Sequence, residues 1–281
     1  MAELLKGAPV AAALNEKTAA MAKTLREKGI VPTLAILRVG ERADDLSYER
    51  GAVKRCAALD IAVRSVALPA DVGEDAFFAA LDALNADASV HGILLLRPLP
   101  QHLDEARACK AIAPEKDVDG CTPGSLAGVF ANTSVGFPPC TAAAAMEMLN
   151  YYQIDCAGKR AAVIGRSLVV GRPLAMLLLH KNATVTICHT KTPNVAEISR
   201  EADIVIACAG QMEHIGTAYL RDGQTVIDVG IHWNEAKGKL CGDINSEEAE
   251  MLSCAITPVP GGVGAVTTAV LAHHTVCAAA K

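Results

Sequence analysis

The stretch Ala161–Leu174 reads AAVIGRSLVVGRPL and decides the expected fold of the chain. A run of small apolar residues, typical of a buried strand, leads directly into Gly165. A short loop follows, and Gly171, Arg172 and Pro173 open a helix, with Pro173 expected at its first position, where the missing N–H costs nothing. Such a strand–loop–helix turn aims the amide groups and the positive dipole end of the helix at a bound phosphate.

This turn is not a G-x-G-x-x-G motif, because Arg166 and Ser167 lie between its two glycines. On the motif alone, an ordinary strand–loop–helix turn is an equally good interpretation. The next strand favours a dinucleotide, since it ends in residues 188–192, CHTKT, and lacks the carboxylate that would bind the ribose of NAD. His189, Thr190 and Arg166 therefore favour the 2′-phosphate of NADP, and a solvated basic loop is the alternative.

Two later strands, expected over residues 203–208 and 225–229, also run into turns that contain glycine. Small residues in these turns let a cofactor approach the backbone closely. The predicted cofactor-binding residues are Gly165, Arg166, Ser167, Gly171, His189, Thr190, Gly210 and Ile231.

Apolar runs of strand length alternate with helical patterns along the whole chain, which is typical of an α/β protein with parallel sheets. A proline-containing region over residues 98–139, which we expect to consist mainly of loops, separates two such series. We therefore expect one α/β domain over residues 1–140 and a Rossmann-like domain over residues 141–265, with a final helix, 266–281, packing back on the first. The expected strands cover residues 32–39, 61–68, 92–96, 160–164, 183–188, 203–208, 225–229 and 255–256, and the expected helices cover 10–28, 44–59, 74–86, 141–152 and 266–280.

Composition excludes several classes of function. Of the 281 residues, 51% are hydrophobic and only 3% aromatic, which indicates an aliphatic core rather than an aromatic nucleic-acid platform. The net charge of −5, with basic residues spread along the chain, gives no footprint for nucleic acid. No apolar run is long enough for a membrane span, and no signal peptide is evident, so we expect a cytoplasmic protein. The ten cysteines form no C-x-x-C pair, so we expect reduced thiols and no metal site.

Three further segments are distinctive: Lys116–Gly120 (KDVDG), Pro139–Thr141 (PCT) and Pro258–Gly264 (PVPGGVG). Together with Gly165–Ser167 and the order of elements, they resemble the methylenetetrahydrofolate dehydrogenase/cyclohydrolase (FolD) family, over about residues 34–268. The resemblance implies two α/β domains with a folate cleft between them, NADP on the C-terminal domain, and a homodimer. It also implies a place in one-carbon metabolism, where 5,10-methylenetetrahydrofolate is oxidised to the methenyl form and then hydrolysed to 10-formyltetrahydrofolate.

The resemblance also implies roles for individual residues. Tyr48 matches the tyrosine that packs on the folate, and Asp119 matches the carboxylate that binds the pterin; both are candidate catalytic and substrate-binding residues. A carboxylate suits that task because it can accept two parallel N–H bonds from the pterin edge. The cleft loop is implied to include Pro260, Gly261 and Gly262, and the positions that meet the NADP phosphates are Arg166, Ser167 and Thr190.

The sequence departs from the family pattern beside the tyrosine. The lysine expected four residues after it is Ala52, and the serine expected three residues before it is Asp45. Lys54 lies about 200° around the helix from Ala52, so it should not face the same cleft. The glutamine expected before the family's Leu-Pro pair is Leu96, and Arg97 is a new neighbour.

These changes affect the two reactions differently. Hydride transfer from the methylene carbon needs positioning and no proton transfer, whereas hydrolysis of the methenyl cation needs a general acid–base. We therefore predict that dehydrogenase activity survives and that cyclohydrolase activity is weak or lost. Both activities survive if Asp45, Arg97 or Lys54 is recruited or the helix register differs. The sequence also fits a non-catalytic regulatory homologue that binds NADP and a pterin, or an NADP dehydrogenase for another small substrate.

Overall fold

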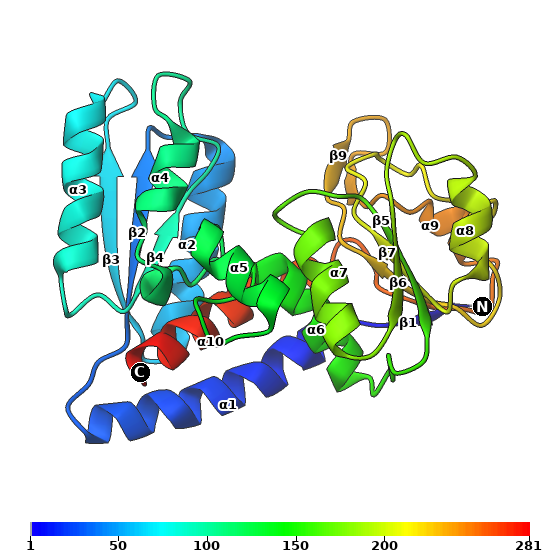
Figure 1. Ribbon diagram of the computed structural model, residues 1–281, viewed down its shortest axis with the longest axis horizontal. Coiled ribbons are helices and arrows are strands. Elements are labelled where there is room, and N and C mark those ends of the chain that lie inside the picture. Colours follow the sequence, from blue (N-terminus) through cyan, green and yellow to red (C-terminus); the bar gives the residue numbers. More distant parts are fainter. Residues whose placement is uncertain (1) are drawn as a thin grey trace. The chain divides into compact units, whose positions relative to one another are not determined.

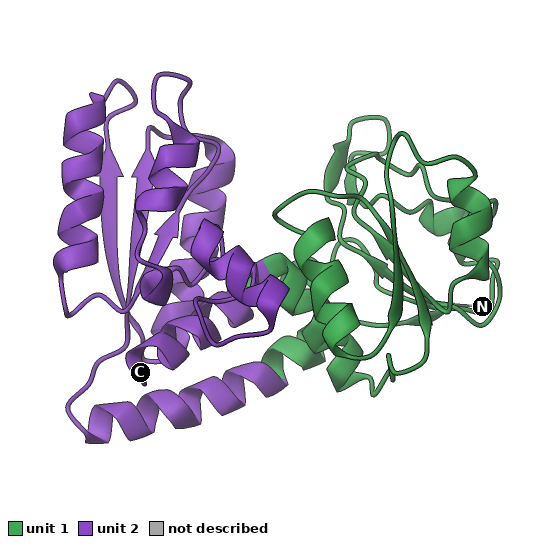
Figure 2. Cartoon of the chain, in the orientation of Figure 1, with its two compact units in different colours: residues 1–12, 141–267 green, residues 13–140, 268–281 purple. Residues whose placement is uncertain are grey.

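The computed structural model describes residues 2–281 as two compact units (Figure 2). Unit 1 contains Met1–Ala12 and Thr141–Thr267, and unit 2 contains Ala13–Cys140 and Thr268–Lys281. The start of the chain therefore groups with unit 1, which corrects the expectation that residues 1–140 form one domain.

The physical reason for this grouping is a short strand at the start of the chain. Strand β1 (Glu3–Leu4) pairs in parallel with β11 (Ala255–Ile256), and the Glu3 amide donates to the Cys254 carbonyl at 2.8 Å. A two-residue strand has no periodicity that a sequence pattern could reveal.

Unit 1 is built on a six-stranded parallel sheet in the order β1-β11-β8-β7-β5-β6. After β5 the chain passes through a helix to β6 on one side and then returns to β7 on the other. This reversal of direction is a topological switch point, where open α/β sheets bind ligands beyond the carboxyl ends of their strands. The strands are β5 (Arg160–Ile164), β6 (Thr184–Cys188), β7 (Ile204–Ala207) and β8 (Thr225–Asp228); the helices are α6 (Cys140–Tyr151), α7 (Gly171–His180), α8 (Val195–Glu201) and α9 (Ser246–Ala249).

The strands that were expected in unit 1 fall within one or two residues of their predicted ranges. Two other details of unit 1 differ from the prediction. Helix α7 begins at Gly171, so Pro173 is its third residue rather than its first. An antiparallel hairpin of β9 (His232–Asn234) and β10 (Lys239–Cys241) was not expected, because strands of three residues carry too little alternation to be recognised.

Unit 2 contains a three-stranded parallel sheet in the order β3-β2-β4, and Figure 1 shows helices on both sides of it. Its centre is aliphatic, as the composition indicated: Leu37, Leu81 and Ile93 are fully buried around Phe77. The strands are β2 (Thr33–Val39), β3 (Ala62–Leu68) and β4 (Gly92–Leu95). The helices are α2 (Ala43–Ala58), α3 (Glu74–Ala86), α4 (Glu105–Ala111), the 3-10 turn η1 (Pro114–Lys116), α5 (Pro123–Ala131), α10 (Thr267–Ala279) and α1 (Gly7–Glu27), which begins in unit 1.

Three other features of residues 2–281 bear on function. None of the helices described there is long and apolar enough to cross a membrane. Over the same residues, no group of three or more His, Cys, Asp or Glu side chains is placed to hold a metal ion. All ten cysteines are free thiols.

The turn after β5 yields a stability prediction. Gly165 has a φ of 139°, and a Cβ built on it would lie 2.1 Å from the Cys208 carbonyl oxygen. Gly165→Ala should therefore destabilise the protein by about 1–3 kcal/mol and lower its melting temperature by roughly 2–10 °C in a thermal unfolding scan. Gly51→Ala is the matched control, since its Cβ meets nothing within 4 Å in helix α2 and should be neutral or slightly stabilising. Equal melting temperatures for the two variants would contradict the close packing at Gly165.

Candidate active site

Tyr48 and Asp119 lie near one another in unit 2. Tyr48 is half-buried on α2, and Asp119 follows the η1 turn. Burial is the main cause that raises the pKa of Tyr48 well above its ordinary value, and the neighbouring Asp119 and Cys140 raise it further. The Tyr48 hydroxyl therefore stays protonated at neutral pH and can donate a hydrogen bond, but it cannot act as a base.

The loop that carries Asp119 is fixed by the preceding aspartate. The fully buried Asp117 carboxylate accepts hydrogen bonds from the Cys121 amide at 3.0 Å and the Thr122 amide at 2.7 Å. Gly120 adopts a φ of 71°, and a Cβ there would lie 2.3 Å from the Pro139 nitrogen. The KDVDG segment thus turns sharply and packs closely against the PCT segment.

A histidine of the last helix also holds this loop, and no pattern in the sequence indicated it. His274 is buried on α10, and its Nδ1 donates to the Val118 carbonyl at 2.9 Å. Burial lowers the pKa of His274 to about 4, so the ring is neutral at physiological pH. The Cys140 thiol donates to the same carbonyl at 3.2 Å, and burial raises the pKa of Cys140 well above its ordinary value, as befits a structural thiol.

Asp119 itself has an unusual electrostatic environment. Burial raises the pKa of Asp119 to about 6; the Arg97 guanidinium opposes this rise, and the negative charge of Asp117 adds to it. The Asp119 side chain is nevertheless 21% exposed, so a ligand can reach it. Above about pH 6 it is a carboxylate that accepts N–H donors.

Arg97 lies just beyond β4 and contacts Asp119, a contact that the sequence did not predict. Its Nη2 is 3.6 Å from Oδ2 of Asp119. Burial acts to lower the pKa of Arg97, but the thiols of Cys121 and Cys109 and the Asp119 carboxylate raise it above its ordinary value. Arg97 therefore keeps its charge and cannot replace a lysine as a proton acceptor.

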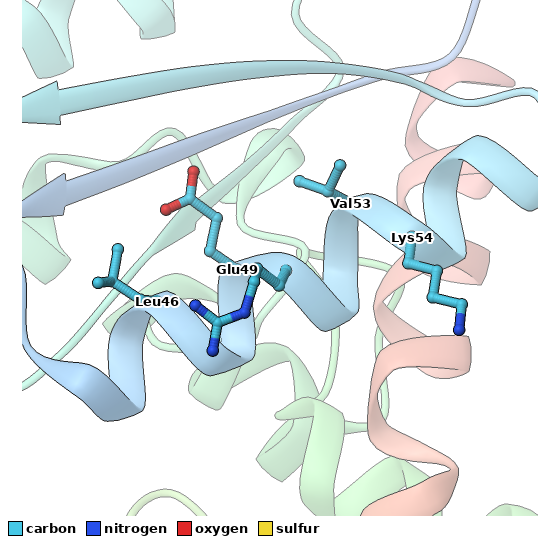
Figure 3. A pocket seen from close by; sticks show the side chains of 5 residues that line it. Leu46, Glu49, Val53 and Lys54 are labelled. Atoms are coloured by element: carbon cyan, nitrogen blue, oxygen red, sulfur yellow. The ribbon is translucent and has the colours of Figure 1, made fainter.

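The position of the family lysine carries no charge and no proton donor. Ala52 is 1% exposed, on the same buried face of α2 as Asp45. Lys54 is exposed and lines a shallow groove with residues of the same helix, Leu46, Glu49, Arg50 and Val53 (Figure 3). Leu96, at the position of the family glutamine, is buried, with 6% of its surface exposed. Asp45 therefore shares the face of Ala52, and Lys54 does not.

The predicted cofactor residues of unit 1 all lie at one edge of its sheet. Gly165, Arg166 and Ser167 follow β5, and the other predicted positions follow β6, β7 and β8 or begin α7. These parallel strands end at the same edge, so the loops are neighbours. Exposed residues among them are Arg166, Ser167, Thr190, Gly210 and Ile231.

A buried carboxylate that sequence patterns did not identify joins two of these loops. Asp243 is fully buried and accepts hydrogen bonds from the amides of Gly210 and Gln211, both at 3.0 Å, and from the Ala209 amide. The same carboxylate lies 2.7 Å from Nε2 of His232, just beyond Ile231. The turns after β7 and β8 are thereby held by one side chain.

The loop Pro260–Gly262 belongs to unit 1, whereas Tyr48 and Asp119 belong to unit 2. The Val259–Pro260 bond is cis, Gly261 has a φ of 100°, and the Gly7 amide donates to the Gly261 carbonyl at 2.7 Å. A short 3-10 turn, η2 (Val263–Ala265), follows. Pro260 and Gly261 are exposed and Gly262 is buried.

The switch point and glycine-rich turns of unit 1 define an α/β protein with a dinucleotide-binding domain. Two family profiles match the chain: "Tetrahydrofolate dehydrogenase/cyclohydrolase, catalytic domain" over residues 5–119 and "Tetrahydrofolate dehydrogenase/cyclohydrolase, NAD(P)-binding domain" over residues 139–281. The chain belongs to the tetrahydrofolate dehydrogenase/cyclohydrolase family.

Individual relatives are similar over their whole length. The chain is 50% identical to the bifunctional protein FolD of Carboxydothermus hydrogenoformans, across 98% of this chain and 96% of that protein. The bifunctional enzyme FolD of Campylobacter jejuni is 37% identical and has a TM-score of 0.95, with 100% of this chain and 99% of that chain covered. The Trypanosoma brucei dehydrogenase–cyclohydrolase, solved with NADP and an inhibitor, is 36% identical with a TM-score of 0.91, covering 99% and 97%.

The contact between Arg97 and Asp119 yields a prediction for the carboxylate. Arg97→Leu should raise the pKa of Asp119 further, by roughly one unit, because it removes the cation and leaves the burial and Asp117 in place. A carbon-13 NMR titration of the carboxyl groups measures this change. Arg64→Leu is the control, since Arg64 pairs with Asp87 at the surface and should leave Asp119 unaffected. An unchanged Asp119 titration in Arg97→Leu would contradict the electrostatic role given to Arg97.

Proposed function

We propose that the chain oxidises 5,10-methylenetetrahydrofolate to 5,10-methenyltetrahydrofolate with NADP and has weak or no methenyltetrahydrofolate cyclohydrolase activity. The observation that carries this proposal is the state of unit 2. Tyr48 and Asp119 lie near each other, whereas the family's lysine and glutamine positions hold Ala52 and Leu96.

The residues at the edge of the unit 1 sheet fit a dinucleotide phosphate. A Cβ at Gly171 would lie 2.3 Å from the Gly165 carbonyl oxygen, so only a bare backbone allows the first turn of α7 to approach this loop. Arg166 and Ser167 are exposed there to bind phosphate oxygens, and His189 and Thr190 supply donors where NAD-specific domains carry an acid. When bound, NADP supplies the hydride acceptor.

Unit 2 supplies the folate-binding groups in this proposal. Asp119, ionised above about pH 6, accepts N–H bonds from the pterin ring, and the half-buried Tyr48 ring packs against the ligand. Oxidation of the methylene carbon is driven by the lone pairs of the folate nitrogens. The protein therefore contributes binding and orientation, for which no proton acceptor is needed.

Hydrolysis of the methenyl product demands more of the same residues. A water molecule must lose a proton as it attacks, and a nitrogen must gain one as the ring opens. Ala52 and Leu96 carry no titratable group, Tyr48 holds its proton, and Arg97 stays charged. Asp45 is the remaining acid on this face of α2, and Lys54 faces away from it.

Two further expectations belong to this proposal. The protein works as a homodimer, as the family resemblance implied, and we expect it to be cytoplasmic. Its partners are a tetrahydrofolate-derived small molecule and NADP, with no nucleic acid or membrane.

Purified protein supplied with 5,10-methylenetetrahydrofolate and either NADP or NAD tests the dehydrogenase. We expect reduced cofactor and methenyltetrahydrofolate to appear in equal amounts, faster with NADP than with NAD. Binding of both ligands without turnover would instead favour the regulatory homologue. Cofactor reduction only with a different small substrate would favour reuse of the folate cleft.

Restoring a lysine at position 52 tests whether its absence causes the proposed loss of cyclohydrolase activity. Ala52→Lys should raise the rate of methenyltetrahydrofolate hydrolysis at least ~100-fold, because a positioned general acid–base typically contributes 10²–10⁴-fold. Val53→Lys is the matched control, since it adds the same side chain to the exposed groove of α2 (Figure 3) and should change nothing. Equal hydrolysis by both variants would count against the proposed register of this helix.

A second substitution tests cofactor selection. Arg166→Gln should raise the KM for NADP roughly 10-fold and the KM for NAD much less, because it removes one charge-assisted hydrogen bond to phosphate. Arg160→Gln is the control, since Arg160 lies at the opposite end of β5 and pairs with Glu201. A parallel rise in both KM values would contradict a role for Arg166 in recognising the 2′-phosphate.

A further inference from the structure

Arg97 is a cation with few strong partners. Its guanidinium has five N–H donors, yet the contacts of Nη1 and Nη2 are the Cys109 sulfur at 3.9 Å and the Asp119 carboxylate at 3.6 Å. Among residues 2–281, no acceptor contacts the buried Nε. Thiol sulfur is a weak acceptor, and 3.6 Å is longer than an ordinary charge-assisted hydrogen bond, so much of the donor capacity is unused.

The spare donors of Nη1 and Nη2 are available to a ligand, whereas Nε is buried. The Arg97 side chain is 22% exposed and the Asp119 side chain 21%, so both members of this contact in unit 2 are partly accessible. A carboxylate beside a guanidinium presents an acceptor next to a planar set of donors. The complement of that pair is a cyclic amide edge, on which an N–H group lies next to a carbonyl oxygen.

We propose that Arg97 is a specificity-determining residue, which donates to the ring carbonyl of the pterin while Asp119 accepts from the adjacent ring N–H. The proposal rests on the proposed function, in which Asp119 binds the folate. It adds a residue to that function: the permanent positive charge at this site belongs to Arg97, just beyond β4, rather than to a lysine on α2. Arg97 selects ligands that carry a carbonyl oxygen at this ring position over ligands that carry an amino group.

A purely structural Arg97, which only neutralises Asp119, makes a different prediction. In that case its loss acts only through the Asp119 carboxylate, to which the 4-oxo ring presents its ring N–H and the 4-amino ring its exocyclic N–H, so the two ligands should be weakened by similar factors. The ratio of the two affinities therefore distinguishes an Arg97 that contacts the ligand from an Arg97 that only neutralises Asp119.

The experiment measures dissociation constants of folic acid, which has a carbonyl at C4 of the pterin, and of 4-amino-4-deoxyfolic acid, which has an amino group there. In the wild-type protein and in Arg64→Leu, folic acid should keep its full advantage. In Arg97→Leu, the ratio of the 4-amino to the 4-oxo dissociation constant should fall roughly 10-fold, the size expected for one charged hydrogen bond. Arg97→Lys retains the charge but not the planar fork, and should lower the ratio by a smaller factor; it also serves if Arg97→Leu fails to fold.

Two results overturn the proposal and can be told apart. An unchanged ratio in both Arg97 variants, with wild-type protein that binds folic acid and oxidises methylenetetrahydrofolate, overturns the role of Arg97 alone. Wild-type protein that neither binds folic acid nor oxidises the substrate overturns the proposed function and this inference with it.

Discussion

The hydrogen bonds accepted by the buried Asp117 carboxylate are the interaction on which the proposed folate site of unit 2 depends. They tie down the amides of Cys121 and Thr122 and so fix the turn that presents Asp119. A buried carboxylate is tolerated because backbone donors satisfy it, and removing those donors would leave a charge in a dry environment. The neutral His274 ring adds a second anchor from the last helix, which belongs to unit 2.

The electrostatics of this site follow from burial. Asp119 is pushed toward the neutral form, and Arg97 opposes that push without itself being able to exchange a proton. The proposed pterin binding requires the carboxylate to be ionised, which holds above about pH 6. Hydrolysis requires a group that both takes up and releases a proton, and the face of α2 beside Tyr48 presents Ala52 in that position. In the proposed function, the residue at position 52 therefore decides whether hydrolysis accompanies oxidation.

Elements long enough to show a repeating or continuous apolar pattern were predictable from the sequence. Contacts between segments that are distant in the sequence were not. The buried strands and the Gly165 turn were predicted because apolar runs and glycines carry local signals. Strand β1 and the β9–β10 hairpin were missed because strands of two or three residues are too short to show an alternation of apolar and polar residues. The contacts of Arg97 with Asp119 and of Asp243 with Gly210 join segments over 20 residues apart, and single-sequence patterns do not encode such pairings.

Hydrolysis of added methenyltetrahydrofolate is the most direct test of the separation between the two reactions. The substrate is supplied without NADP, and its loss is followed in the presence and absence of purified protein in the same buffer. The proposed function, with folate-binding groups near Ala52 but no lysine, predicts that the protein binds the substrate and that the substrate is lost only at the spontaneous rate. Clearance well above the spontaneous rate would contradict this and would mean that another residue, with Asp45 the first to examine, performs the proton transfer.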